Sequence, residues 1–301
     1  MGMLQFLLSY LINNTFILMI GMLSVYLLTS LTGMLSMGQA SFMAVGGYAA
    51  AIVSKYLHMP LIVSMIVAMA AGALFGLLIG LPAVRLRRDY VAIVSLGFGE
   101  ALVAFLNNFS TFTGGAMGIT NIPKYTNKTI ICVVLVVLVA LIWNFKKSRF
   151  GRFCIAIKGD ELAAASMGIN VARIKLLIFV MAGAISALGG SIYVHTTTYL
   201  DPAAFGWDQS SMWIIMVFFG GVNSLTGSLV AGIVLGLIPE LLRFSNELRM
   251  IIYCVLVLLA VNFRPQGLFG TTEWDIATIR RGFKKLANQL GRGNRNAVGN
   301  K

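Results

Sequence analysis

The sequence predicts an all-α fold, a polytopic transmembrane helical bundle of about eight to ten spans. Of the 301 residues, 58% are hydrophobic and only 11% are charged, and the mean hydropathy is +0.87. A soluble protein carries about 25% charged residues, which form a hydrated surface that this chain lacks. A bilayer instead accepts an apolar exterior and requires helices, whose backbone hydrogen bonds are all internal. The composition therefore excludes a soluble globular protein.

The expected spans are the apolar runs between polar or basic interruptions. They lie near residues 15–31, 36–54, 61–81, 90–107, 129–145, 174–196, 209–221, 225–243 and 250–263. Residues 3–13 are a candidate for one further short span. The run at 209–221 is short for the roughly 20 residues that a transmembrane helix needs. The number of spans therefore stays open by one at each of these two places.

The basic residues are concentrated between the apolar runs. Of the 23 lysines and arginines, 18 fall within three stretches, at 85–89, 146–175 and 264–301. Cytoplasmic loops of membrane proteins carry an excess of Lys and Arg. This distribution predicts that the three stretches are cytoplasmic and that the 108–128 and 197–208 loops lie outside. It also explains the net charge of +13 without a nucleic acid partner.

The chain is expected to contain a transmembrane domain at 1–270, which includes the basic loop at 146–175, and a C-terminal segment at 271–301. Apolar residues recur in this segment at alternating spacings of three and four, with basic residues between them. Such a pattern predicts a cytoplasmic amphipathic helix on an anionic membrane surface. Beyond Gly291 the polar tail is expected to be disordered.

Two Gly-containing segments in opposite halves suggest an internal repeat. The sequence GMLS at 33–36 opens one Gly/Ala-rich run, and GVNS at 221–224 opens another. Transporters are often built from two such halves, with interrupted helices at corresponding positions. Other glycines are spaced by four residues, which favours close helix packing; they are Gly72, Gly76, Gly80, Gly232 and Gly236.

The segment 158–168 predicts a short helix with caps at both ends. Asp160 is a good N-cap, Glu161 suits the positive end of the helix dipole, and Gly168 suits the residue after the C-cap. An ordinary loop helix is one interpretation, and a helix that docks into a groove on a partner is the other. The residues expected to share a small apolar docking face are Ala163, Ala164 and Met167.

Four polar residues inside the apolar runs are candidates for a translocation path: Gln39, Ser41, Ser95 and Glu100. Polar groups in hydrocarbon are costly and tend to face the bundle interior or a pathway. Hydrogen bonding between helices is the alternative for each of them. Glu100 looks deeply embedded, and it could accept hydrogen bonds from a neighbouring helix or pair across a subunit interface. No cluster has catalytic or metal-ligand spacing, so neither a catalytic nor a metal site is expected.

Six blocks of sequence carry a more specific resemblance. They are GMLSMGQASFMAVGGYAAA at 33–51, RLRRDYVAIVSLGFGE at 85–100, TGGAMGITNIP at 113–123, GRFCIAIKGDELAAASMGIN at 151–170, FFGGVNSLTGSLVAGIVLG at 218–236 and FRPQGLFG at 263–270. In these blocks and their order the chain resembles the LivM-type permeases of the high-affinity branched-chain amino acid ABC importers. In the fourth block, Ala163, Ala164 and Gly168 match the E-A-A-x-x-x-G pattern of a coupling helix. Leu162 stands at the acidic position, and Glu161 lies one residue early. One other departure is Ala116 and Met117, where Pro-Asn is expected.

The resemblance implies a permease subunit for leucine, isoleucine and valine in the inner membrane of a bacterial cell. It implies a homologous second permease subunit as heterodimer partner, two cytoplasmic ATPase subunits and an extracytoplasmic substrate-binding protein. It also implies that the helix at 158–168 contacts an ATPase. The sequence lacks a G-x-x-x-x-G-K-[ST] phosphate loop, so ATP hydrolysis is assigned to partner chains and this chain is not expected to be an enzyme. No cofactor is expected.

Two alternative functions stay open. The same machinery could carry urea or short amides, since permeases for these cargoes are similar, and the sequence of the cognate binding protein would decide. An ion-coupled secondary carrier is an alternative of another class. Such carriers need embedded acids paired with cations, and this chain offers Glu100 alone. An ion-flux assay without ATPase partners separates the two classes.

Overall fold

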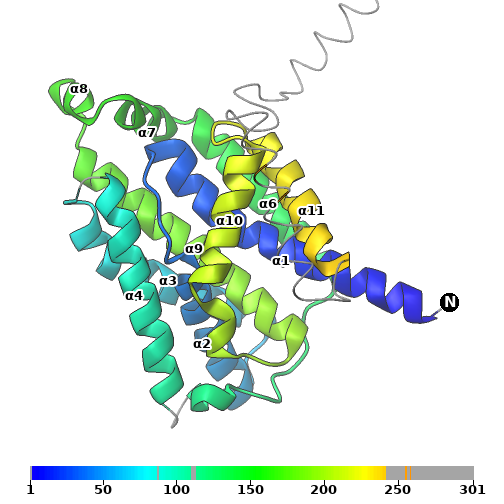
Figure 1. Cartoon of the computed structure of the whole chain (residues 1–301). Helices are drawn as coiled ribbons and strands as arrows, with labels where there is room; N and C mark the ends of the chain where they lie inside the picture. The colour runs from blue at the N-terminus through cyan, green and yellow to red at the C-terminus, as the bar shows by residue number, and fades with distance from the viewer. Residues whose placement is uncertain (1, 87, 110–112, 242–254, 256–257, 259–301) are drawn as a thin grey trace, which may run out of the picture.

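The computed structural model describes residues 2–86, 88–109, 113–241, 255 and 258, and these residues form a helical bundle (Figure 1). Apart from residues 255 and 258, the predicted span at 250–263 lies outside the described residues, as does the whole segment 271–301. The helices are α1 Gly2–Thr32, α2 Gln39–Tyr56, α3 Leu61–Ala83, α4 Arg88–Asn108, η1 Gly115–Met117, α6 Lys128–Lys147, α7 Arg149–Gly159, α8 Glu161–Ser166, α9 Val171–Thr197, η2 Pro202–Phe205, α10 Trp207–Gly220 and α11 Leu225–Leu241.

The predicted all-α membrane fold is confirmed. Five helices in the described part of the chain are long and apolar enough to cross a membrane; they contain Tyr10–Thr32, Leu61–Ala83, Tyr90–Asn108, Lys128–Lys147 and Val171–Thr197. The predicted spans at 36–54, 209–221 and 225–243 coincide with the shorter helices α2, α10 and α11. Residues 3–13 do not form a separate span, because they belong to the continuous 31-residue helix α1.

Helix α9 lies at the centre of the bundle and packs along α1, α2 and α3. Glycines bring these helices close together. A Cβ at Gly46 of α2 would lie 2.2 Å from the carbonyl oxygen of Ala187, and one at Gly72 of α3 would lie 2.6 Å from that of Gly183. The packing role predicted for Gly72 is therefore confirmed, because any side chain there would push α3 away from α9.

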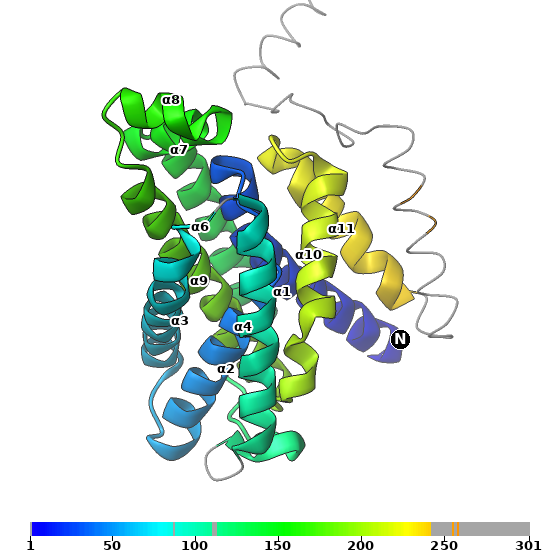
Figure 2. The ribbon, with the colours of Figure 1, turned by 60° about the vertical axis from the view of Figure 1, so that its left-hand side comes forward.

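Helices α10 and α11 form a hairpin that packs on α1 (Figure 2). The turn at 221–224 joins them, and it begins at Gly221, which has a φ of +108°. The helices approach closely, since a Cβ at Gly220 would lie 2.4 Å from the carbonyl oxygen of Gly227. The predicted GVNS break thus separates two antiparallel helices of 14 and 17 residues.

The connections gather at two opposite ends of the bundle. At one, α7 and α8 are bonded to Arg88, the first residue of α4; we call it the α7–α8 end (top of Figure 1). At the other, Ile119 and Leu200 form an antiparallel bridge near η1 and η2; we call it the η1–η2 end. The basic stretches at 85–89 and 146–175 thus share one end, and the 108–128 and 197–208 loops share the other, as the charge pattern requires.

Candidate functional site

The α7–α8 end carries a short helix with both termini capped. The Asp160 carboxylate accepts hydrogen bonds from the backbone amides of Leu162 and Ala163, at 2.8 and 3.2 Å. After Ser166 the chain turns at Gly168, whose φ of +82° favours glycine over any residue with a side chain. The predicted caps are confirmed, and the helix they enclose spans Glu161–Ser166, with Met167 as its C-cap.

The C-terminal cap of α8 is a Schellman motif. The amide of Ile169 donates to the carbonyl of Ala164 at 3.2 Å, and the amide of Gly168 donates to that of Ala165 at 3.0 Å. Because both ends of α8 are closed by hydrogen bonds, few of its backbone groups depend on water. A helix of six residues is marginal by itself, so these caps and its contacts with α7 and α9 hold it in place.

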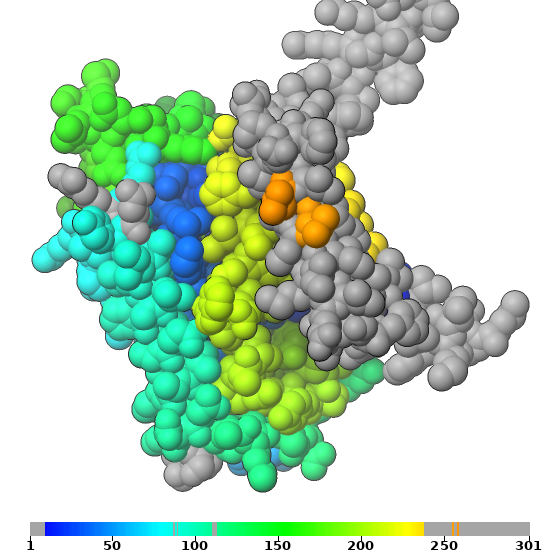
Figure 3. Space-filling model, viewed as in Figure 1, coloured from blue at the N-terminus to red at the C-terminus, as the bar shows by residue number. Residues whose placement is uncertain are grey.

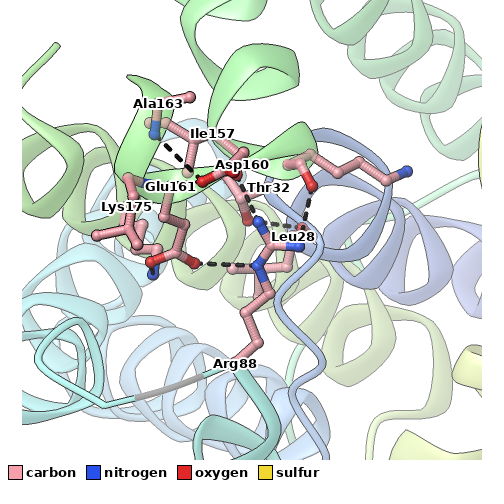
Figure 4. A network of polar contacts seen from close by, with 10 residues as sticks. Leu28, Thr32, Arg88, Ile157, Asp160, Glu161, Ala163 and Lys175 are labelled. Carbon is pink, nitrogen blue, oxygen red and sulfur yellow. Dashed lines mark hydrogen bonds and ion pairs between the residues drawn. The ribbon is translucent and has the colours of Figure 1, made fainter. Parts of the chain in front are cut away.

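Glu161 ties α8 to two membrane-spanning helices (Figure 4). Its Oε1 accepts from Arg88 Nε of α4 at 3.0 Å, and its Oε2 lies 2.6 Å from Lys175 Nζ of α9. Partial burial favours the neutral acid, but hydrogen bonds and positive charge from Lys175 and Arg88 outweigh it and hold the pKa of Glu161 below its ordinary value. The carboxylate is therefore ionised at neutral pH and fixes α8 against α4 and α9.

The rotation of α8 corrects one prediction from the sequence. Ala164 does not share an exposed face with Ala163 and Met167, because its side chain is only 4% exposed. Residues three apart lie on the same face of a helix, so the inward-facing Glu161 turns Ala164 inward as well. The large exposed apolar side chains of this segment are instead Leu162 and Met167, at 81% and 83% exposure. In the space-filling view α7 and α8 form a protruding corner of the molecule (Figure 3).

Three of the predicted path residues meet where α2 begins. Residues 33–38 are not helical and lead into α2 at Gln39, so the interruption predicted at 33–36 is present. The Ser41 hydroxyl donates to the carbonyl of Gly38 at 2.6 Å. The Ser95 hydroxyl of α4 accepts from the amide of Met37 at 3.0 Å. Gln39, Ser41 and Ser95 are all buried, with at most 1% exposure.

Two further serines hold this start of α2, and the sequence analysis missed both. The Ser186 hydroxyl of α9 donates to the carbonyl of Gln39 at 2.8 Å, and the Ser210 hydroxyl of α10 accepts from the amide of Ala40 at 2.9 Å. Their signal in the sequence is weak, because serines are common in Gly/Ala-rich helices. The side-chain oxygen of Gln39 has no hydrogen-bond partner among the described residues. The start of α2 is thus a buried polar centre between α4, α9 and α10.

Glu100 is placed differently from the expectation of a deeply embedded acid. It is exposed on the surface of the single chain, and its Oε1 accepts from the backbone amide of Trp207 at 2.9 Å. Trp207 is the first residue of α10, so Glu100 caps that helix from α4. The expected hydrogen bond to a neighbouring element is confirmed. The side chain is not buried, because it lies on the side of α4 that the rest of the described chain leaves uncovered.

These features define a class: a polytopic helical membrane protein with a capped helix fixed by ion pairs at one end. Within the described residues there is no group of three or more His, Cys, Asp or Glu that could hold a metal ion. The chain belongs to the family of branched-chain amino acid transport system permease components, whose model matches residues 7–261. It is a relative of ABC permease subunits, which are not enzymes.

Individual relatives support this assignment and the resemblance seen in the sequence. The chain is 30% identical to the high-affinity branched-chain amino acid transport system permease protein LivM of Escherichia coli K12, over 83% of this chain and 67% of the relative. It is 28% identical to LivH of the same system and organism, over 61% and 56%. It is also 28% identical to the ribose import permease protein RbsC of that organism, over 44% of each. No solved structure matches the chain.

Proposed function

We propose that this chain is a permease subunit of an ABC importer for branched-chain amino acids, and that α8 is its coupling helix. The family membership and the similarity to LivM and LivH support the importer and its cargo. The observation that carries the coupling role is the geometry of α8. Both of its ends are capped, Glu161 ties it to α4 and α9, and Leu162 and Met167 project outward.

The partners follow from the same reasoning. Similarity to both LivM and LivH, two permeases of one system, supports a permease pair in which this chain is one subunit. Two ATPase subunits bind at the α7–α8 end, which is the cytoplasmic face of the inner membrane. An extracytoplasmic substrate-binding protein delivers the amino acid at the η1–η2 end. The basic stretches at 85–89 and 146–175 support this orientation.

The coupling mechanism is a rigid-body movement. Leu162 and Met167 insert into a groove on the ATPase, whose movement on ATP binding displaces α8. A capped helix moves as a unit, whereas a flexible loop would absorb the displacement. The Glu161 carboxylate passes the movement to α4 through Arg88 and to α9 through Lys175.

We place the translocation path along the buried polar centre at the start of α2. Gln39, Ser41 and Ser95 offer hydrogen-bonding groups to a zwitterionic amino acid, and Glu100 lies further along α4. Because the first three are buried in this structure, α4 must move away from the 33–38 segment to open the path. Ser95 is bonded to that segment and lies on the helix that Glu161 moves. This links α8 to the path.

Loss of this chain is expected to abolish high-affinity uptake of leucine, isoleucine or valine, with urea uptake unchanged. The measurement is uptake of radiolabelled leucine at low micromolar concentration, in cells whose redundant systems have been deleted. Unchanged leucine uptake together with reduced urea or short-amide uptake would assign the other cargo. Ion-coupled uptake by the chain without ATPase partners would instead identify a secondary carrier.

The orientation predicts which single cysteines react from outside the cell. In a background lacking Cys132, Cys154 and Cys254, a cysteine at Ala165 should resist a membrane-impermeant thiol reagent in intact cells. One at Lys124 should react. Both native residues are exposed on the chain. A difference in their reaction with the reagent therefore reports the side of the membrane on which each lies. Labelling at Ala165 from outside would reverse the assigned orientation.

A further inference from the structure

Lys158, in the last turn of α7, joins three separate parts of the chain. Its Nζ donates to the carbonyl oxygen of Ser30 at 2.9 Å and to the side-chain oxygen of Asn223 at 2.6 Å. Ser30 lies in the last turn of α1, and Asn223 lies in the turn between α10 and α11. One ammonium group therefore connects the helix that precedes α8 to α1 and to the α10–α11 hairpin.

These contacts form a series of helix caps. The last carbonyl groups of a helix lack partners within it and carry the negative end of its dipole, so cations bind them. Arg88 of α4 donates to the carbonyls of Ile157 and Lys158, at 2.5 and 2.9 Å, and so caps α7. Lys158 in turn caps α1 through Ser30. Each cap links one helix to the end of another, from α4 through α7 to α1.

Asn223 is held by two lysines at once. Its side-chain oxygen accepts from Lys158, and its backbone carbonyl accepts from Lys146 of α6 at 2.8 Å. Lys146 also donates to the Tyr26 hydroxyl of α1 at 3.2 Å. The turn between α10 and α11 is thus bonded at Asn223 to α6 and α7, and both lysines also bond to α1, although Asn223 itself is exposed.

The backbone leaves room for the Lys158 side chain. Gly33, with a φ of +71°, turns the chain just after α1, and a Cβ there would lie 3.3 Å from both Lys158 Cγ and Arg88 Nη1.

Burial, and then the positive charges of Lys146 and Arg88, lower the pKa of Lys158. The partners that hold its ammonium, Ser30 and Asn223, are neutral oxygens. Neither partner is a carboxylate, so the contact depends on the position of Asn223.

We infer that Lys158 is a positioning residue that makes the α10–α11 hairpin and the end of α1 move with α8. This inference rests on the coupling role proposed for α8. Glu161 bonds to α4 and α9, whereas Lys158 bonds to α1 and the hairpin. A displacement of α8 is thus passed to α4 and α9 through Glu161, and to α1 and the hairpin through Lys158. Arg88 is bonded to both residues.

Two substitutions test the Lys158 contact without changing α8. Asn223→Ala removes the side-chain acceptor and keeps the backbone carbonyl for Lys146. Lys158→Met removes the ammonium and keeps an unbranched side chain beside Gly33. Each is compared with wild type in the importer purified with its partner chains and reconstituted in vesicles. Leucine import and ATP hydrolysis are measured in the same vesicles, and retention of the ATPase chain is measured on purification.

Both variants are expected to retain the ATPase chain and to hydrolyse more ATP per leucine imported. The increase should be at least about fivefold, the lower end of the usual range for coupling between sites. Asn223→Asp keeps an acceptor for Lys158 and should restore the wild-type ratio. The double variant Lys158→Met with Asn223→Ala should be no worse than either single variant, because both remove the same contact.

Three results would overturn the inference, and they are distinguishable. Wild-type ratios in both single variants, with normal ATP-driven import by wild type, would reject Lys158 and leave the coupling role of α8 in place. Loss of the ATPase chain from Asn223→Ala would show a role in assembly instead of transmission. Absence of ATP-dependent import in the wild-type complex would reject the proposed function and the inference together.

Discussion

Replacing Leu162 or Met167 with aspartate is expected to abolish ATP-driven uptake and to release the ATPase chain during purification. Both side chains are more than 80% exposed on the chain, so a charge there does not disturb its own folding. In the docked complex the same charge would be desolvated and unpaired, at a cost of several kcal/mol. Since about 1.4 kcal/mol corresponds to a tenfold change in affinity, each variant should bind the ATPase about 100-fold more weakly.

Met117→Asp is the matched control for these two substitutions. Met117 is 85% exposed, but it lies in η1 at the opposite end of the bundle, so its variant should keep the ATPase chain. Ala164→Asp is a poorer test, because the buried Ala164 would lose packing within its own chain. Wild-type uptake and wild-type ATPase retention in Leu162→Asp would refute the docking of α8.

The second large effect is expected from Glu161→Gln. This change leaves the ammonium of Lys175, which is 2% exposed, without its carboxylate. Removing one partner of a fully buried ion pair costs roughly 3–5 kcal/mol, and less is expected here because Glu161 is 32% exposed. Helix α8 should detach from α4 and α9, and uptake should fall even where the ATPase still binds. Hydrogen exchange of the 160–168 amides, measured with uptake, checks this.

The same ion pairs predict a dependence on pH. The pKa of Glu161 is lowered in the folded chain, so its stabilisation of α8 is fully present above the unfolded pKa and is lost as pH falls through the folded pKa. The protection of the 160–168 amides, measured relative to their intrinsic exchange rates at each pH, should therefore fall on acidification more in wild type than in Glu161→Gln. Ser166→Ala, on the exposed face of the same helix, is the control and should behave as wild type. Equal protection of α8 in wild type and Glu161→Gln at neutral pH would contradict the anchoring role.

Much of the fold could be predicted because membrane insertion depends on local composition. Eight of the nine expected spans overlap helices of the structure, and the ninth lies almost entirely outside the described residues. The caps of α8 were also predictable, since Asp160 and Gly168 act on backbone groups a few residues away. Such short-range rules need no knowledge of the rest of the chain.

The orientation of side chains was harder to predict, because distant residues determine it. Arg88 lies 73 residues before Glu161, and the pairing of these residues decides that Ala164 faces inward. Likewise, Ser210 lies 170 residues after Ala40, so its contact with the start of α2 left no pattern in either segment. Glu100 looked embedded by its position in an apolar run, yet only the packing of α4 shows which side of that helix is covered.

The most direct test of the central claim is a photo-crosslink from α8 to its partner. A photoreactive amino acid is placed at Leu162 in the chain expressed with its native partners, and the crosslinked product is identified by mass spectrometry. The coupling role predicts a product that contains an ATP-binding chain, with crosslinking that changes when ATP is trapped in the complex. The same amino acid at Met117 should give no such product. An ATP-binding chain crosslinked at Met117 but not at Leu162 would contradict the proposed coupling helix.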